Sequence, residues 1–101
     1  MIAEGIVRAR NVDIAMIIIT EWAYEYDVDL DVDAYAQIRQ DNAEELVTKT
    51  LMAIHFLQTL ESCNNNQVSQ QATNELERLQ AAIIASIEQD GGNVGNNGDQ
   101  V

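Results

Sequence analysis

Apolar residues recur every three or four positions through residues 43–60, which is the longest pattern of this kind in the chain. The stripe consists of Ala43, Leu46/Val47, Thr50/Leu51, Ile54, Leu57 and Leu60. Such spacing predicts a helix with one buried face. We expect this central helix to end near Ser62, where Asn64-Asn-Asn-Gln67 supplies a polar turn.

A second stripe predicts a C-terminal helix that packs against the central one as an antiparallel hairpin. Its members are Ala72, Leu76, Leu79, Ile83 and Ile87. Ser69 or Thr73 is suited to the N-cap, and Asp90-Gly91-Gly92 is expected to stop the helix. Residues 91–101 are rich in Gly and Asn and contain no core-forming pattern, so we predict a flexible tail there.

The N-terminal pattern predicts a first helix over residues 2–26, in which Asn11 leaves open a break after a short leading turn. Glu4 and Arg8 have the i, i+4 spacing of a stabilising ion pair. Ile14 to Ile19 is a run of six apolar residues, which surrounds a helix on all sides. Either the third helix and the long Trp and Tyr side chains cover this run, or a second copy of the chain does. We favour a homo-oligomer with its interface at Ile14, Ile17, Ile18 and Ile19.

Residues 24–34 alternate strictly between apolar and acidic side chains, a pattern typical of extended backbone with one buried face. No second segment of this kind is present to pair with it. We therefore expect an extended acidic connection between helices, with Val28, Leu30 and Val32 facing the helices. Its outward side chains are Asp27, Asp29, Asp31 and Asp33. A partly helical alternative remains, because Asp31 or Asp33 has the chemistry of an N-cap.

The chain is expected to return to helix from Asp33, with Tyr35 and Ile38 facing inward and a break near residue 40 left open. Proline is absent, and no glycine occurs between Gly5 and Gly91. Tight hairpin turns depend heavily on glycine, so a β-rich fold is disfavoured. We predict an all-α, three-helix bundle: a single domain over residues 1–90, followed by the tail.

The formal net charge of −12 is concentrated in one quarter of the sequence. Between Glu21 and Glu45, nine acidic residues accompany a single basic one, Arg39. Phosphate backbones and anionic lipids repel such a chain, so we expect neither direct nucleic-acid nor membrane binding. The complementary partner is a protein with a basic surface. One cysteine, Cys63, allows no internal disulfide and fits a cytoplasmic location.

No constellation in the sequence indicates catalysis or a cofactor. The aspartate series lacks the glycine and glutamate of an EF-hand loop in either register, starting at Asp27 or at Asp29. His55 is the only histidine and has no glutamate three or four residues away. Cys63 is eight residues further along the same predicted helix, too far for a thiol–imidazole pair. We expect a non-enzymatic protein with His55 packed or at an interface.

These features favour a small inhibitor that acts by protein contact, of the kind that phages and mobile elements use against restriction or CRISPR machinery. Its acidic segment 21–45 would occupy a basic groove that normally holds nucleic acid. The predicted partner-binding residues are Glu21, Trp22, Glu25, Tyr26, Asp27, Asp29, Asp31 and Asp33. Two other hypotheses remain open: an oligomeric assembly or adaptor subunit, and an oligomer that holds a small ligand in a pocket. Tyr24, Tyr26, Tyr35 and Arg39 are the candidate lining of that pocket.

Overall fold

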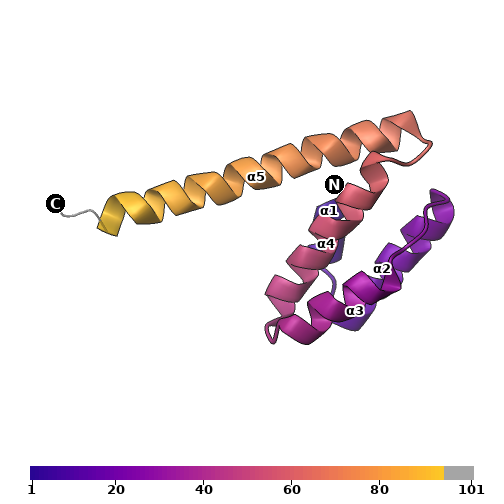
Figure 1. Ribbon diagram of the computed structural model, residues 1–101, viewed down its shortest axis with the longest axis horizontal. Helices are drawn as coiled ribbons and strands as arrows, with labels where there is room; N and C mark the ends of the chain where they lie inside the picture. The colour runs from indigo at the N-terminus through magenta and orange to yellow at the C-terminus, as the bar shows by residue number, and fades with distance from the viewer. Residues whose placement is uncertain (95–101) are drawn as a thin grey trace.

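The computed structural model describes the backbone of residues 1–94 and the side chains of residues 1–89. Within this part of the chain the fold is all-α, as predicted, and no β-strand is present. The described helices, shown in Figure 1, are α1 (Ile2–Val7), α2 (Val12–Glu25), α3 (Val32–Asp41), α4 (Glu45–Glu61) and α5 (Asn66–Val94). The predicted number of three helices is wrong, because two of the expected helices are each divided in two.

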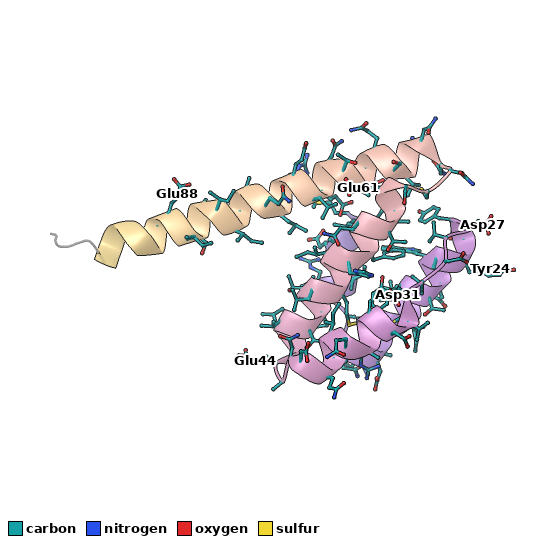
Figure 2. The ribbon with its side chains drawn as sticks, in the orientation of Figure 1. Tyr24, Asp27, Asp31, Glu44, Glu61 and Glu88 are labelled. Carbon is teal, nitrogen blue, oxygen red and sulfur yellow. The ribbon has the colours of Figure 1, made fainter. Side chains whose placement is uncertain are left out.

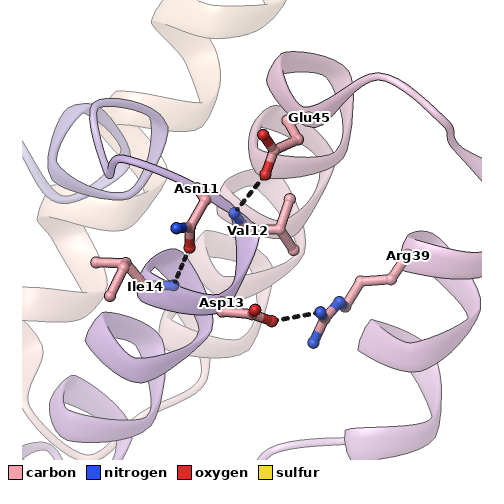
Figure 3. Close-up of polar contacts among 6 residues, drawn as sticks. All are labelled: Asn11, Val12, Asp13, Ile14, Arg39 and Glu45. Atoms are coloured by element: carbon pink, nitrogen blue, oxygen red, sulfur yellow. Dashed lines mark hydrogen bonds and ion pairs between the residues drawn. The ribbon is translucent and has the colours of Figure 1, made fainter.

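The first division lies at Asn11, whose backbone is extended and whose side chain caps α2. Its Oδ1 atom accepts a hydrogen bond from the Ile14 N–H at 2.9 Å. Glu45 of α4 reaches the same helix end and accepts from the Val12 N–H at 3.1 Å, as Figure 3 shows. Two of the unpaired N–H groups at the start of α2 are thereby satisfied. The single helix expected over residues 2–26 is therefore wrong, and the alternative with a break at Asn11 is confirmed.

Lys49 completes this attachment of α4 to the turn before α2. Its ammonium group donates to the Ala9 carbonyl at 2.8 Å. Because Glu45 and Lys49 both bind backbone groups of the residue 9–12 segment, they do not form the i, i+4 pair that their spacing suggests. The Glu4–Arg8 pair expected in α1 is present, at 3.6 Å.

Helix α4 is the centre of the body and contacts all four other helices. Phe56 is fully buried and stacks against Trp22 of α2, with ring centroids 6.4 Å apart. Tyr35 is buried and Ile38 is half-buried against the same core, as predicted. The helix with the longest apolar stripe in the sequence is therefore the one that all the others contact.

The buried face of α4 differs from the predicted one over its first half. Leu46, Val47 and Leu51 are exposed, whereas Thr48 and Met52 are buried. Thr48 can take a core position because its hydroxyl bonds to backbone carbonyls, with the Glu44 oxygen 2.9 Å away. Because Thr48 is polar, a pattern of apolar residues does not identify the helix face on which it lies as the buried one.

Helix α5 begins earlier than expected and continues further. Asn65 is its cap, accepting from the Gln67 and Val68 N–H groups at 3.1 Å each, so neither Ser69 nor Thr73 starts it. The helix runs through the expected stop at residue 90 to Val94. The remainder of the predicted tail, residues 95–101, lies outside the described residues.

The C-terminal half of α5 extends away from the body, which makes the molecule long. Figure 1 shows α4 and α5 meeting at their shared turn and then diverging, in place of a closed antiparallel hairpin. The principal dimensions are 52 × 31 × 21 Å, and the radius of gyration is 16.0 Å. A compact domain of this length would have a radius of about 13 Å. None of the helices in the described range is long and apolar enough to span a bilayer.

Candidate interaction surfaces

The connection between α2 and α3 starts with a tightly hydrogen-bonded helix end. The Val28 N–H donates to the Ala23 carbonyl at 3.0 Å, and the Asp27 N–H donates to the Tyr24 carbonyl at 3.3 Å. These two bonds form a Schellman motif, with Asp27 in the left-handed position at φ 56°. Glycine normally takes this position because it has no Cβ. Here an aspartate takes it, which places a carboxylate directly at the carboxyl end of α2.

The other end of the connection is fixed by Asp31, which caps α3. Its Oδ1 atom accepts from the Ala34 N–H at 3.2 Å, confirming the alternative in which Asp31 is an N-cap. Between these two ends, Val28 and Leu30 are half-buried against the core. Val32 is exposed, contrary to expectation, because α3 has already begun there. Only residues 28–31 lie between the turn that ends α2 and the start of α3. The extended stretch is therefore much shorter than the predicted one, residues 24–34.

Five exposed carboxylates surround this connection, and we refer to them together as the acidic turn. They are Glu25, Asp27, Asp29, Asp31 and Asp33. Figure 2 shows Asp27 and Asp31 at the end of the molecule opposite Glu88 of α5. The ion pairs among the described side chains are Arg8–Glu4 and Arg39–Asp13. All five basic residues of the chain belong to this described part, and none of them neutralises the acidic turn.

A small polar cavity separates the acidic turn from the end of α4. Its volume is about 240 Å³, and its walls include Asp27, Asp29, Thr59, Ser62 and Asn64. The carboxyl ends of α2 and α4 both lie beside this cavity, and each carries the partial negative charge of a helix C-terminus. Neither helix has a basic residue in its last turn. The electrostatic character of this cavity therefore favours a positively charged group.

The aromatic residues near the acidic turn divide between the core and the surface. Trp22 and Tyr26, both predicted to contact a partner, are partly buried and pack against the core. Tyr24, between them, is 90% exposed. Residues four apart share a helix face, whereas a residue midway between them lies on the opposite face. That periodicity is the signal from which Tyr24, rather than Trp22, could have been chosen as the exposed aromatic residue.

The remaining acidic residues of segment 21–45 do not join the acidic turn in one ridge. Glu21 lies on the α2–α3 face, beside Ile17 and the Arg39–Asp13 pair. Glu45 is occupied in capping α2, and Asp41 accepts a hydrogen bond from Gln37. The structure therefore brings Glu25 and the four aspartates together and leaves Glu21 apart from them.

The isoleucines of α2 are likewise divided between the core and the surface. Ile19 is fully buried in the core and so does not belong to a surface, and Ile18 is half-buried. Ile14 and Ile17 are exposed, the latter at 52%. Ile17 lines an open cavity of about 410 Å³ between α2 and α3. An oligomer interface at Ile14 and Ile17 stays a prediction.

The four residues proposed to line a ligand pocket are not gathered at one place. Tyr24 is exposed, Tyr35 is buried on the inner face of α3, and Arg39 pairs with Asp13 at the surface. The rings of Tyr35 and His55 are nearly perpendicular, with centroids 5.0 Å apart, so His55 is a packed residue. Burial raises the pKa of the Tyr35 phenol. The neighbouring Thr59 hydroxyl partly offsets this rise, and the charge of Asp31 adds to it.

No family model, curated protein or solved structure matches this chain. The described side chains also contain no group of three or more His, Cys, Asp or Glu residues arranged to hold a metal ion.

Proposed function

We propose that this protein acts by contact with another protein, presenting the acidic turn to a basic surface. The observation that carries the proposal is the set of five exposed carboxylates at one end of the molecule without a basic neighbour. Glu25, Asp27 and Asp29 lie near the negative ends of α2 and α4, which is electrostatically unfavourable in the free protein, whereas Asp31 and Asp33 are at the favourable N-terminus of α3. A cationic partner would relieve this repulsion on binding.

The acidic turn is held in place rather than loose, which supports a binding role. The Schellman motif fixes its start, the Asp31 cap fixes its end, and two half-buried side chains anchor its middle. A site fixed before binding loses less conformational entropy when a partner arrives. The exposed Tyr24 ring supplies an apolar surface at the same end, and tyrosine is common among residues that dominate interface energy.

The shape of the turn indicates how the partner is recognised. The connection has four extended residues, which are too few to imitate the row of phosphates along a nucleic-acid strand. The acidic turn is therefore a compact binding site. The cavity beside Asp27 and Asp29 suits a lysine or arginine side chain of the partner. We propose a cytoplasmic inhibitor of the anti-restriction or anti-CRISPR kind, which occupies part of a basic groove and excludes the nucleic acid. The acidic turn would make the same contact with a nucleic-acid-binding groove as with another basic face of the partner.

The proposal is tested with two variants that each lose three negative charges. The first, D27N/D29N/D33N, changes the acidic turn but spares Asp31, whose carboxylate caps α3. The matched control, E44Q/E77Q/E88Q, changes three exposed acids far from the turn. Immobilised proteins are used to capture partners from an extract of the source cell at low and raised salt. Captured proteins are then purified and their dissociation constants measured by calorimetry.

We expect wild type and control to bind the same basic protein, and the turn variant to bind it at least about tenfold more weakly. Raised salt should weaken the wild-type complex, because exposed charges are screened within about 8–10 Å. Equal loss of affinity in both variants would show that only net charge matters. Unchanged binding by the turn variant would refute the proposed site.

A further inference from the structure

We infer that two copies of this chain associate through the C-terminal half of α5, at the end of the molecule opposite the acidic turn. This surface differs from the α2 isoleucines, and the inference does not depend on the proposed function. The occupant of the surface is a second copy of the same protein, arranged about a two-fold axis.

The apolar stripe of α5 is continuous, but only its first half is covered. Ala72 and Leu76 are buried against the body, and Leu79 is half-buried where the helix leaves it. Ile83 and Ile87 continue on the same helical face, at 47% and 64% exposure. In a lone copy, this half of the helix would expose isoleucines and lack tertiary support. Most helical stability in proteins comes from packing of an apolar face, so a partner that covered these isoleucines would stabilise this half of the helix.

An apolar groove lies next to the point where α5 leaves the body. It has a volume of about 340 Å³, and its walls are Met1, Ala3, Val7 and Leu79, together with the exposed Glu4–Arg8 ion pair. The groove and the exposed isoleucines thus adjoin one another. Figure 1 shows that α5 extends beyond the body on this side, and Ile83 and Ile87 are exposed there. Each copy therefore offers both an apolar extension and an apolar groove, the two halves of a self-complementary contact.

The distribution of charge favours a second copy at this place. Residues 12–62 contain eleven acidic side chains and two basic ones, whereas residues 1–11 and 63–89 together contain four acidic and three basic ones. Residues 79–87 carry no ionisable side chain. Two copies with a net charge of −12 each repel strongly wherever their acidic surfaces approach. The α1–α5 side is nearly neutral, so contact there keeps the two acidic turns at opposite ends of the dimer.

Helical periodicity gives the register of the contact. An antiparallel pair of α5 helices that crosses at Ile83 places Leu79 of each copy opposite Ile87 of the other. At about 100° per residue, Glu77 and Glu88 lie roughly 120–140° around the helix from Ile83 and so face away from the crossing point. The Arg78 guanidinium lies at the edge of the groove, 4.0 Å from the Met1 sulfur. The register satisfies a two-fold axis and places no charged residue on the apolar stripe itself.

The first test measures association by sedimentation equilibrium over a wide range of protein concentration. The variant Ile83→Glu puts two charges together at the proposed axis, and Ala85→Glu adds the same charge to the opposite side of α5. We expect a wild-type dimer, an unchanged A85E dimer, and a dissociation constant for I83E at least about a hundredfold higher. A wild-type monomer at all concentrations would overturn the inference. So would a dimer that I83E leaves intact.

The second test separates this interface from the one predicted on α2. In a Cys63→Ser background, Ile83→Cys should form a disulfide-linked dimer on mild oxidation, because the two thiols would meet at the axis. Ala85→Cys, on the far side of the helix, should remain unlinked. Dissociation caused by Ile17→Glu, with no cross-link at position 83, would place the interface on α2 and refute the α5 register.

Discussion

The carboxylate of Glu75 lies 2.9 Å from the backbone nitrogen of Ile2, although the two residues are 73 positions apart. Its second oxygen accepts from the Ala3 N–H, also at 2.9 Å. Glu75 is 2% exposed, and the Gln71 amide donates a third hydrogen bond to it. An acidic side chain of α5 thus caps the N-terminus of α1, which has no cap of its own.

We predict that Glu75→Ala lowers the free energy of unfolding by about 3 kcal/mol, since it removes two charge-assisted hydrogen bonds and leaves buried N–H groups unpaired. Glu75→Gln should cost about half as much, because the amide oxygen can still accept one bond. Urea denaturation measures both values. The control is Glu77→Ala, an exposed acid two residues away, for which we expect a change within about 0.5 kcal/mol. Equal effects at positions 75 and 77 would show that the cap contributes nothing.

Gly5, in the middle of α1, offers a stabilising substitution. A Cβ atom built at this position would lie 3.4 Å from the outer ring carbon of Trp22, an ordinary contact distance. Alanine is favoured over glycine inside a helix by about 1 kcal/mol. We therefore expect Gly5→Ala to raise the free energy of unfolding by about 0.5–1 kcal/mol, measured by thermal denaturation. A lower melting temperature would mean that α1 and Trp22 pack too closely to accept a methyl group.

Because Asp27 has a left-handed backbone, a substitution there is expected to change stability and binding affinity in opposite directions. Asp27→Gly should stabilise the protein by about 0.5–1 kcal/mol, because glycine adopts positive φ without steric cost. The same substitution removes a carboxylate from the acidic turn, so the affinity for a basic partner should fall. Asp29→Asn removes one charge at a position of ordinary φ and should weaken binding without the gain in stability. A variant that is more stable yet binds less tightly would show that the carboxylate at position 27 serves recognition.

The sequence predicted features that depend on neighbours in the chain. The all-α class and the inward face of Tyr35 were predicted, and the break at Asn11 and the Asp31 cap were open alternatives; all four follow from local spacing and capping chemistry. Each is set by interactions over a few residues, for which periodicity and turn chemistry are sufficient information. The same reasoning placed the four aspartates on the outside of the α2–α3 connection, where the structure has them.

Features set by contacts between distant residues were missed. Glu75 resembles an ordinary surface acid in its Asn-Glu-Leu-Glu context, and only the arrival of α1 makes it a buried cap. In α4 the apolar pairs Leu46/Val47 and Thr50/Leu51 left the stripe uncertain by one position, about 100° of rotation. Thr48 then fixed the true face through a hydroxyl that bonds to the backbone, which no hydrophobic pattern reveals. A tertiary hydrogen bond decided the position of Glu75, and a local bond from a side chain to the backbone decided that of Thr48.

Tyr35 provides a prediction that depends on pH. Its phenolic oxygen is buried without a hydrogen bond of normal geometry among the described residues, and burial raises the pKa of the phenol above the usual 10.0. The folded protein therefore holds this proton more tightly than the unfolded chain. Below pH 10 the phenol is protonated in both states, and stability does not depend on it. Above pH 10 only the unfolded chain loses the proton, so stability falls by about 1.4 kcal/mol for each further pH unit.

Tyr35→Phe removes both the ionisable group and the unsatisfied hydroxyl. We expect the variant to be about 1 kcal/mol more stable than wild type at neutral pH, because a buried hydroxyl without a partner costs desolvation energy. Urea denaturation across the pH 9 to 11 range should show a steeper loss of stability in wild type than in the variant. Tyr24→Phe, at the exposed position, is the matched control and should change neither value. A destabilised Tyr35→Phe protein would instead indicate that the Thr59 hydroxyl forms a real hydrogen bond with the phenol in solution, and the packing of α3 on α4 would then depend on that bond.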